Sequence, residues 1–502
     1  MSHEKQGETA EHKFLFWACF IALIATAFGF VVRSMVIDTW AAEFSLSATQ
    51  KGEIFGVGLW PFAISIVLFS LVLDKIGYRA AMFFAFACHV ISAIITIKAT
   101  GYWSLYIGTF ICALGNGTVE AVINPVVATV FNRNKTQWLN RLHAGWPGGM
   151  LLGGLLAIAA GGASWQVQVG LILIPTILYG AMMLKAVFPV SERVSAGVSY
   201  IDMLREVGAL GALVAVALIT REIGRVFHLP NEVQIGLIVV VAGGYGLFTR
   251  SLGQPLFVVL LLIMMPLATT ELGTDSWITP LMEGSMKGLG LPPVSVLLWT
   301  SFIMMVLRFM AGPIVHALSP LGLLAASALI AAIGLYSLSL AAGIGILFAA
   351  TFYAFGKTFF WPTMLGVVAE RFPKGGAMTL NTIAGVGMLS VGIVGAPFLG
   401  FVQDSSIDKN LAAYDASNKT ALHATYVTEE KEGVFGKYQA LDLKKVETAP
   451  EGDKTAIHGV TEAATKGALR TVAILPCIML VCYLALLAYF KTQGGYKQVH
   501  LD

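Results

Sequence analysis

Charged side chains are scarce in this sequence. Of its 502 residues only 12% are Asp, Glu, Lys or Arg, whereas 57% are hydrophobic and the mean hydropathy is +0.77. Because soluble domains carry about 25% charged residues, a soluble protein of this length could not cover its surface with so few. Lipid is therefore the expected solvent for much of the surface. The net charge of +3 forms no clustered basic face, so we expect no nucleic-acid partner.

Cysteine is also rare, and no residues have the spacing of a metal site. No pair of cysteines has the spacing of a zinc site or of a disulfide framework. Nucleotide-binding motifs are missing too, so ATP does not drive the protein directly. We therefore expect no metal and no other cofactor. All five cysteines stand inside apolar segments: Cys19, Cys88, Cys112, Cys477 and Cys482.

Long apolar runs are abundant. A helix needs about 20 apolar residues to cross the hydrocarbon core of a bilayer. The weakest of the predicted spans is 208–227, because charged residues crowd its end, and an interfacial helix is the alternative there. Runs of the required size predict about fourteen spans: 14–37, 53–73, 80–99, 104–130, 143–163, 167–189, 208–227, 233–249, 255–280, 293–316, 320–340, 343–368, 378–402 and 467–490.

Basic residues gather in alternate loops, which fixes the expected orientation. Loops rich in Lys and Arg stay in the cytoplasm. We therefore expect a multi-pass protein of the cell (inner) membrane, with both termini cytoplasmic. The polar segment 403–466 then forms a long extracytoplasmic loop, either a partly ordered cap or a solvated insertion. The basic residues that decide this are Lys75, Arg79, Arg133, Lys135, Arg141, Arg250, Arg371, Lys374, Lys491 and Lys497.

Two junctions between predicted spans share a small residue, a polar residue and a tight turn that contains glycine. They are residues 70–79 (SLVLDKIGYR) and 308–322 (RFMAGPIVHALSPLG). A small residue lets two helices approach closely. The first junction resembles the loop signature of the major facilitator superfamily, G-x-x-x-D-[RK]-x-G-[RK]-[RK], with Ser70 and Tyr78 as departures.

This resemblance implies an all-α integral membrane fold of two six-helix bundles around a central cavity. Residues 1–190 would form the first bundle and 255–502 the second, which includes the loop 403–466. The linker 191–254 would supply two additional central helices. We assign a gating or cytoplasmic-loop role to four residues: Asp74, Arg79, Arg308 and His143, the last because it follows Arg141 at the expected cytoplasmic end of its helix.

The fourth span carries polar residues on one helical face. Asn116, Glu120 and Asn124 recur every four residues, and Glu120 lies near the centre of the span. Ionisable residues inside a membrane are costly, so each suggests a function. We predict that Glu120 is the proton-coupling carboxyl, with a structural hydrogen bond or ion pair as the alternative.

This span also carries a closer resemblance. The pattern E-x-x-x-N-P at 120–125, followed by 140–144 (NRLHA) before a glycine-rich fifth span, is similar to the fucose–proton symporter branch of the superfamily. In that branch the Glu of this motif is one of two key membrane carboxylates, and Glu120 occupies its place. The segment 271–277 (ELGTDSW) is weakly similar as well. The second carboxylate is missing, because Ser34 stands there, with Arg33 beside it and Asp38 one turn further on.

Other polar residues in the spans complete the predicted solute site. Arg33 could bind an anionic solute, or it could extend to the outer interface. Lys357 is close to mid-membrane and should face the cavity or pair with Glu271. The full predicted set is Arg33, Asn116, Asn124, Glu271, Lys357, Trp361 and Asn381.

The sequence thus predicts a secondary active transporter that works by alternating access. Its solute would be small and polar, most simply a sugar, and its coupling ion H⁺ or Na⁺, with protons favoured by Glu120. A carrier of an organic anion or a nucleoside, by symport or antiport, is the alternative. The nine histidines are scattered, so an enzyme is not expected, and a membrane-embedded enzyme or sensor stays as a remote alternative. We expect a monomer in the lipid bilayer.

Overall fold

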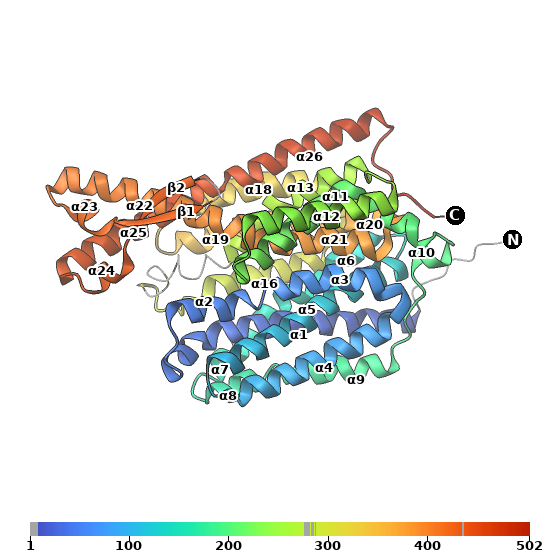
Figure 1. The fold of residues 1–502 in the computed structure, drawn as a ribbon, viewed down its shortest axis with the longest axis horizontal. Coiled ribbons are helices and arrows are strands. Elements are labelled where there is room, and N and C mark those ends of the chain that lie inside the picture. The colour runs from blue at the N-terminus through green and yellow to red at the C-terminus, as the bar shows by residue number, and fades with distance from the viewer. Residues whose placement is uncertain (1–8, 276–281, 283–285, 287, 434–435, 502) are drawn as a thin grey trace.

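The protein is a bundle of long helices that run in roughly one direction, with a small α/β unit projecting from one end (Figure 1). The computed structural model describes residues 9–501 apart from 276–281, 283–285, 287 and 434–435. The first and the last described residues of the chain lie at the end opposite the α/β unit (Figure 1). We call these ends the terminal face and the cap face.

The first part of the chain, which we call the N-half, consists of helices alone. Local signals explain several of the boundaries: Ser47 and Gln50 form a capping box before α2, and Gly77 ends α3 with a φ of 80°. The helices are α1 (Ala10–Glu43), α2 (Ala48–Gly56), α3 (Trp60–Ile76), α4 (Tyr78–Ile97), α5 (Tyr102–Val130), α6 (Lys135–His143), α7 (Gly145–Ala159), α8 (Trp165–Gly170) and α9 (Leu173–Lys185).

The linker contains α10 (Glu192–Ser195), α11 (Tyr200–Val226) and α12 (Asn231–Thr249). Helix α11 is kinked at Gly208, where φ is +58° and a Cβ atom would collide with the backbone of Gly253. The Ala209 amide donates to the Ser251 carbonyl at this kink, at 2.9 Å. The helix predicted at 208–227 therefore begins earlier than expected and has the length of a membrane span.

The rest of the chain is the C-half. Its membrane part holds α13 (Pro255–Ala268), the π-helical turn η1 (Thr269–Gly273), α16 (Ser295–Phe309), α17 (Ala311–Leu318), α18 (Pro320–Leu340), α19 (Gly345–Lys357), α20 (Phe360–Arg371), η2 (Pro373–Gly375), α21 (Gly376–Ser390), η3 (Val391–Gly395), α22 (Ala396–Asn418), α25 (Glu451–Val472) and α26 (Ile474–Thr492). Helices α22 and α25 continue out of the bundle and carry the α/β unit (Figure 1).

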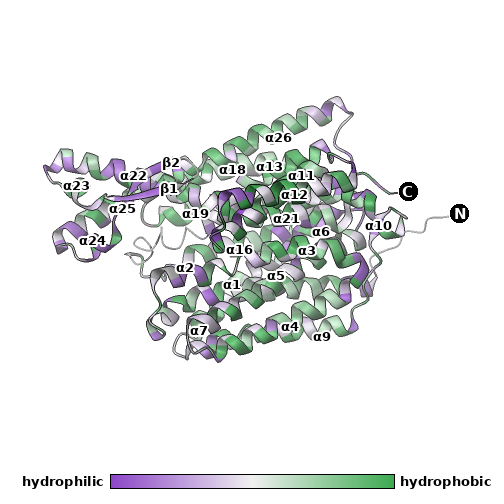
Figure 2. Ribbon diagram, viewed as in Figure 1, coloured by the Kyte–Doolittle hydropathy of each residue, from purple (hydrophilic) through white to green (hydrophobic). Residues whose placement is uncertain are grey.

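Helix length and hydropathy confirm the all-α membrane fold. Among the described residues, twelve helices are long and apolar enough to cross a membrane, and the pair α16–α17, bent by 67°, makes a thirteenth. The segment predicted as a single span at 343–368 is instead α19 and α20, which are 13 and 12 residues long. Hydrophobic residues cover the body of the bundle, whereas hydrophilic residues concentrate in the α/β unit (Figure 2).

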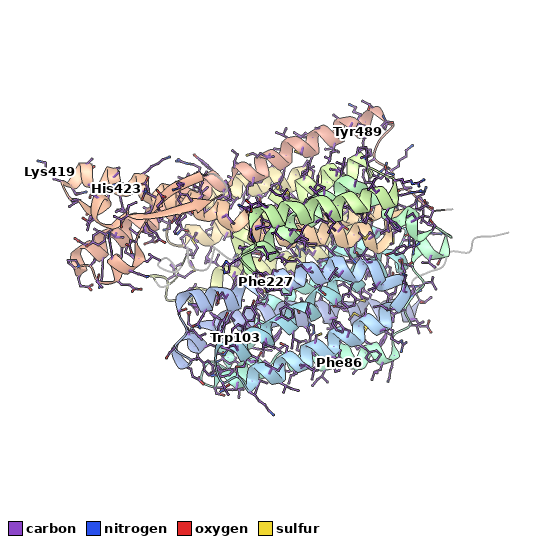
Figure 3. The ribbon with its side chains drawn as sticks, in the orientation of Figure 1. Phe86, Trp103, Phe227, Lys419, His423 and Tyr489 are labelled. Carbon is purple, nitrogen blue, oxygen red and sulfur yellow. The ribbon has the colours of Figure 1, made fainter. Side chains whose placement is uncertain are left out.

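The described residues of the predicted loop 403–466, which are all but 434–435, form a folded unit that we call the cap. It contains the outer parts of α22 and α25, α23 (Leu422–Tyr426), α24 (Leu443–Glu447) and an antiparallel hairpin of β1 (Glu429–Gly433) and β2 (Gly436–Ala440). Lys419 and His423 lie at its far end, whereas Tyr489 lies near the terminal face (Figure 3). The cap has a small core of its own, formed by Ile407, Leu411, Leu422, Tyr426, Val427, Leu441, Ala449, Ile457 and Ala464.

Candidate functional site

A central pocket of about 310 Å³ lies between the two halves. The N-half and the C-half both contribute charged and aromatic side chains to it. Three of the residues predicted for the solute and proton site line this pocket, and so do two residues that were assigned to the cytoplasmic side. The lining consists of Phe62, Glu120, His143, Trp146, Glu271, Leu272, Arg308, Trp361 and Met388.

A buried ion pair occupies one wall of the central pocket. Arg308 Nη2 donates to Glu271 Oε1 at 2.7 Å, and only 1% and 3% of the two side chains are exposed. Arg308 also donates to the His143 carbonyl, at 2.8 Å, and so joins the two halves. The placement of Arg308 with the cytoplasmic loop is therefore wrong, and so is the alternative pairing of Glu271 with Lys357. Residue spacing along a single helix could not identify the partner of Glu271, because Arg308 comes from a different helix.

Two irregular helical segments hold this ion pair. Glu271 stands in the π-helical turn η1, a form that is frequent at functional sites. The break between α19 and α20 frees backbone groups that a continuous helix would use internally. The Trp361 amide donates to Glu271 Oε2 at 3.0 Å, and the Thr358 carbonyl accepts from Arg308 Nε at 2.7 Å.

Glu120 faces the ion pair from the N-half. Its Oε2 accepts from Asn124 Nδ2 at 2.7 Å, and Asn124 Oδ1 bonds to His143 Nε2 at 2.8 Å. All three side chains are buried. In the part of the chain that the structure describes, no Lys or Arg nitrogen lies within 4.0 Å of the Glu120 carboxylate. Glu120 therefore differs from Glu271, whose charge is neutralised.

His143 ends helix α6, but it does not begin its membrane span. The fifth span was expected to begin at His143, but it runs from Lys135 to Ala159 through α6 and α7. His143 is consequently about two turns inside the span and is 2% exposed.

Lys357 has a partner other than the predicted one. It is fully buried and forms an ion pair with Asp275. Its neighbour Tyr353 bonds to Thr274 at 2.5 Å. Lys357 and Trp361 are four residues apart in the sequence, but the break between α19 and α20 sends them to different surroundings. Trp277, from the segment that resembles the symporter branch, lies outside the described residues.

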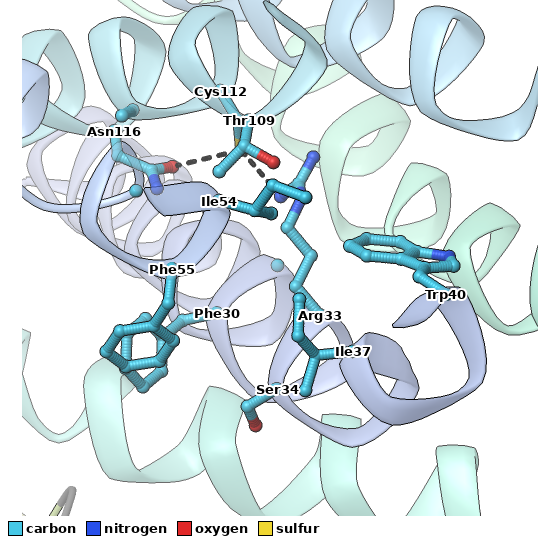
Figure 4. A pocket seen from close by; sticks show the side chains of 13 residues that line it. Phe30, Arg33, Ser34, Ile37, Trp40, Ile54, Phe55, Thr109, Cys112 and Asn116 are labelled. Carbon is cyan, nitrogen blue, oxygen red and sulfur yellow. Dashed lines mark hydrogen bonds between the residues drawn. The ribbon is translucent and has the colours of Figure 1, made fainter. Parts of the chain in front are cut away.

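A second pocket, of about 470 Å³, contains Arg33 and Asn116. Arg33 donates to Cys112 Sγ at 2.8 Å and to Ser92 Oγ at 2.7 Å, and its Nε has no partner in the described part of the chain. Figure 4 shows the guanidinium beside Cys112 and Thr109, with Trp40 and Ile37 nearby. No described carboxylate lies within 4.0 Å of Arg33, so its charge is unpaired. Asn116 belongs to this pocket rather than to the Glu120 group.

Asn381 joins the two halves. Its Nδ2 donates to the Ala121 carbonyl at 3.1 Å, and its Oδ1 has no partner among the described residues. Asn381 is fully buried next to the helix that carries Glu120.

At the terminal face the N-half is bonded to the linker and within itself. Of the predicted loop residues, Asp74 forms an ion pair with Arg193 of the linker, and Arg79 donates to the Ala186 carbonyl at 2.6 Å. Lys135 is 1% exposed; it pairs with Glu192 of the linker at 2.5 Å and donates to the Ala369 carbonyl of the C-half at 3.2 Å. The burial of Lys135 was not predicted from the sequence, although this residue begins an amphipathic segment.

Glu370 on α20 is the centre of this closed face. Its Oε1 accepts from the Thr136 hydroxyl at 2.5 Å and from the Thr136 amide at 3.2 Å, which joins the C-half to the N-half. Its Oε2 accepts from Tyr496 at 2.9 Å, in the tail after α26. The Glu370 carbonyl also accepts from the Val499 amide at 2.8 Å. One carboxylate therefore bonds both halves and the C-terminal tail.

Substitution of Glu370 should loosen this face. In Glu370→Gln one of the two acceptor oxygens becomes an NH₂ group, and the bonds to the other oxygen lose their charge assistance. We therefore expect the ratio of closed to open terminal faces to fall by about tenfold, or ~1.4 kcal/mol. Spin labels at the exposed positions Arg133 and Lys374, in a background without accessible cysteines, would report this as a longer distance. Glu447→Gln in the cap is the control. An unchanged distance distribution would contradict the assignment.

Fold and site together define a polytopic membrane protein with charged residues between two helical halves. The family model of the Major Facilitator Superfamily matches residues 18–397. The chain belongs to this superfamily and is a membrane transporter.

Several solved structures of the superfamily are similar to the chain. The xylose:proton symporter XylE of E. coli, bound to 6-bromo-6-deoxy-D-glucose, has a TM-score of 0.61 and 13% identity over 93% of this chain and 94% of that one. The E. coli fucose:proton symporter FucP has a TM-score of 0.55 and 14% identity over 93% and 98%. The human organic anion transporter TETRAN has a TM-score of 0.56 and 11% identity over 95% and 100%. At these identities the similarity concerns the fold.

One curated relative is similar in sequence. The hexuronate transporter of Bacillus subtilis (strain 168) is 28% identical over 147 residues, or 29% of this chain. The match spans about a third of that relative's length, 35%.

Proposed function

We propose that the protein is a proton-coupled carrier of a small, sugar-like solute that works by alternating access. The observation that carries this proposal is the contrast between two buried carboxyl groups in one pocket. Glu271 is held in its charged form by Arg308, whereas Glu120 has no cation within 4.0 Å in the described residues. A buried carboxylate without a cation is costly, so Glu120 is the group that can bind a proton on one side and release it on the other.

The surroundings of Glu120 suit a polar ring. Trp146 and Trp361 supply flat apolar surfaces in the same pocket, and His143 supplies a polar ring edge. Sugar rings present apolar C–H faces and polar hydroxyl edges, which match such a lining. The solved structures of two sugar:proton symporters share the fold, which supports the same solute class.

Transport is expected to use the two halves as moving parts, with residues 1–190 and 255–502 as the bundles and 191–254 as the linker. We place both termini in the cytoplasm and the chain in the cell membrane, because the basic loops lie at the terminal face. The bonds of Glu370 to Thr136 and of Lys135 to the Ala369 carbonyl join the two halves and then close the cytoplasmic side. Lys357 and Asn381 support the site from the C-half.

Uptake by proteoliposomes tests the proposal. Purified protein would be supplied with D-glucose, D-xylose, D-fucose, D-glucuronate and D-galacturonate, with and without an inward proton gradient. We expect at least one of these to accumulate only when the gradient is imposed. Absence of uptake for all of them, in protein that is correctly folded, would contradict the proposed solute class.

A second candidate, a carrier of sugar acids or other organic anions, is favoured by Arg33. A guanidinium whose charge has no carboxylate partner in a pocket is suited to bind a carboxylate of the solute. The similarity to a hexuronate transporter points the same way.

Substitution of Arg33 separates the two candidates. If the solute is a sugar acid, Arg33→Met should raise KM for D-glucuronate by about 10- to 100-fold, because a charge-assisted hydrogen bond contributes about 1.5–3 kcal/mol. Arg33→Lys should recover part of this loss. KM for D-glucose would change little in both variants. An equal change in the KM values for D-glucuronate and D-glucose would contradict an anion-binding role of Arg33.

A further inference from the structure

A buried histidine of the N-half is not used by the proposed function. His89 on α4 is 3% exposed and lies behind the second pocket rather than in it. Its Nε2 bonds to Asn116 Oδ1 on α5 at 2.9 Å, and its Nδ1 bonds to the Tyr179 hydroxyl on α9 at 3.0 Å. The two rings meet edge to face at 5.8 Å. Three helices are thus connected through one imidazole.

Close packing fixes the position of this imidazole. A Cβ atom at Gly115 would lie 2.7 Å from His89 Cδ2, so only glycine lets α5 approach the ring this closely. The next residue along α5 is Asn116, whose side chain lines the second pocket. The ring therefore has little freedom to move away from the Asn116 amide.

The hydrogen-bond partners decide which ring nitrogen carries the proton. A neutral imidazole has one N–H donor and one acceptor nitrogen. Asn116 Oδ1 can only accept, so His89 Nε2 is the donor and Nδ1 is the acceptor for the Tyr179 hydroxyl. Because Oδ1 is occupied in this way, the amide presents its NH₂ group to the pocket.

The same wall of the pocket contains a second donor. Arg33 has N–H donors only, and its Nη1 contacts Cys112, whose sulfur lies 4.0 Å from Asn116 Oδ1. Figure 4 shows Arg33, Cys112 and Asn116 joined in this order. Arg33 and Asn116 together therefore offer hydrogen-bond donors to whatever enters the pocket.

We infer that His89 is a positioning residue that, held by Tyr179, orients the Asn116 amide so that the second pocket selects a carboxylate-bearing solute over its neutral counterpart. The inference rests on the second candidate function, a carrier of sugar acids, and names the residue that sets its preference for a carboxylate. The carboxylate accepts from Asn116 Nδ2 and from Arg33. Without His89 the amide can rotate and turn its oxygen toward the carboxylate, where the two acceptors repel each other.

The test compares KM and turnover for D-glucuronate and D-glucose in proteoliposomes. His89→Leu should raise KM for D-glucuronate by about tenfold and KM for D-glucose by less than about twofold, with turnover retained. His89→Gln should bring the KM for D-glucuronate most of the way back to the wild-type value, because its amide N–H can donate to Asn116 Oδ1. Tyr179→Phe, which keeps the packing, should raise the ratio of the KM for D-glucuronate to the KM for D-glucose by a smaller factor than His89→Leu. The control is Tyr245→Phe, whose hydroxyl bonds to the Leu204 carbonyl away from the pocket.

The possible failures are distinguishable. If the wild-type protein takes up none of the five solutes named above, the proposed solute class is overturned and this inference with it. If it transports some of them but takes up D-glucuronate no better than D-glucose, only the inference is overturned. If the wild-type protein transports the probes but His89→Leu and Tyr179→Phe leave the KM ratio unchanged, only the inference is overturned. An equal KM change for both probes, or a His89→Gln variant as impaired as His89→Leu, would overturn it by showing a packing role.

Discussion

Arg308→Met should destabilise the protein by about 3–5 kcal/mol and abolish transport. The substitution leaves Glu271, 2% exposed, as a charge in the interior without its cation. Breaking a buried ion pair from one side costs this much, because the desolvated partner stays behind. The Thr358 and His143 carbonyls lose a donor in the same step. A lower unfolding temperature in detergent, together with loss of uptake, would be measured.

A second substitution separates stability from function. Adding Glu271→Gln to Arg308→Met removes the orphaned charge, so most of the lost stability should return. Transport should not return, because the bond between the halves and the charge in the pocket are both missing. Lys437→Met is the control: this residue pairs with Glu430, and both side chains are more than half exposed, at 66% and 54%, so the cost should be only about 0.2–1 kcal/mol. Equal destabilisation in Arg308→Met and Lys437→Met would contradict the central role of the Glu271–Arg308 pair.

Glu120→Gln should uncouple solute movement from the proton gradient. The amide keeps the size of the side chain and its ability to accept from Asn124, but it cannot bind and release a proton near neutral pH. We expect accumulation against a concentration gradient to be lost, whereas exchange of labelled for unlabelled solute across the membrane continues. Uptake under an inward proton gradient and counterflow at equal pH would be measured side by side with the same vesicle preparation.

The control for Glu120→Gln is Glu222→Gln. Glu222 is also buried in a predicted membrane helix, at 4% exposure, but it pairs with Arg225 in the linker. Its substitution should leave gradient-driven accumulation intact. A Glu120→Gln variant that accumulates solute as well as the wild-type protein would exclude Glu120 as the coupling group.

The sequence was sufficient to predict the features of the protein that depend on hydropathy and on loop residues. Apolar runs predicted most membrane helices, because lipid leaves a chain no other way to satisfy its backbone groups. The motif at 70–79 identified the superfamily, and the polar spacing on α5 led to Glu120. Glu120 does lie in the central pocket, together with the predicted Glu271 and Trp361.

Partner choice could not be predicted in the same way. Arg308 reaches Glu271 across the bundle, and Lys357 reaches Asp275, because π-helical and broken segments redirect side chains that regular spacing would align. One signal for Arg308 was present: it is a lone charge at the end of the apolar run 295–309. His89 likewise stood in an apolar span, but its partners Asn116 and Tyr179 come from helices that only the fold brings together.

The folded structure of the cap could not be predicted from its composition either. The segment 403–466 is polar, and its few apolar residues are spread thinly along the chain. They form a core only because α22 and α25 hold the two ends of the segment close together.

Solute-induced proton movement is the most direct test of proton coupling through Glu120. Wild-type protein would be reconstituted into lightly buffered vesicles that contain a pH-sensitive dye, with no imposed gradient and with the membrane potential clamped. Addition of the transported sugar or sugar acid outside should acidify the lumen in the wild-type vesicles and not in Glu120→Gln vesicles, although both admit solute. Solute entry without lumenal acidification in the wild-type protein, or equal acidification in both, would contradict proton coupling through Glu120.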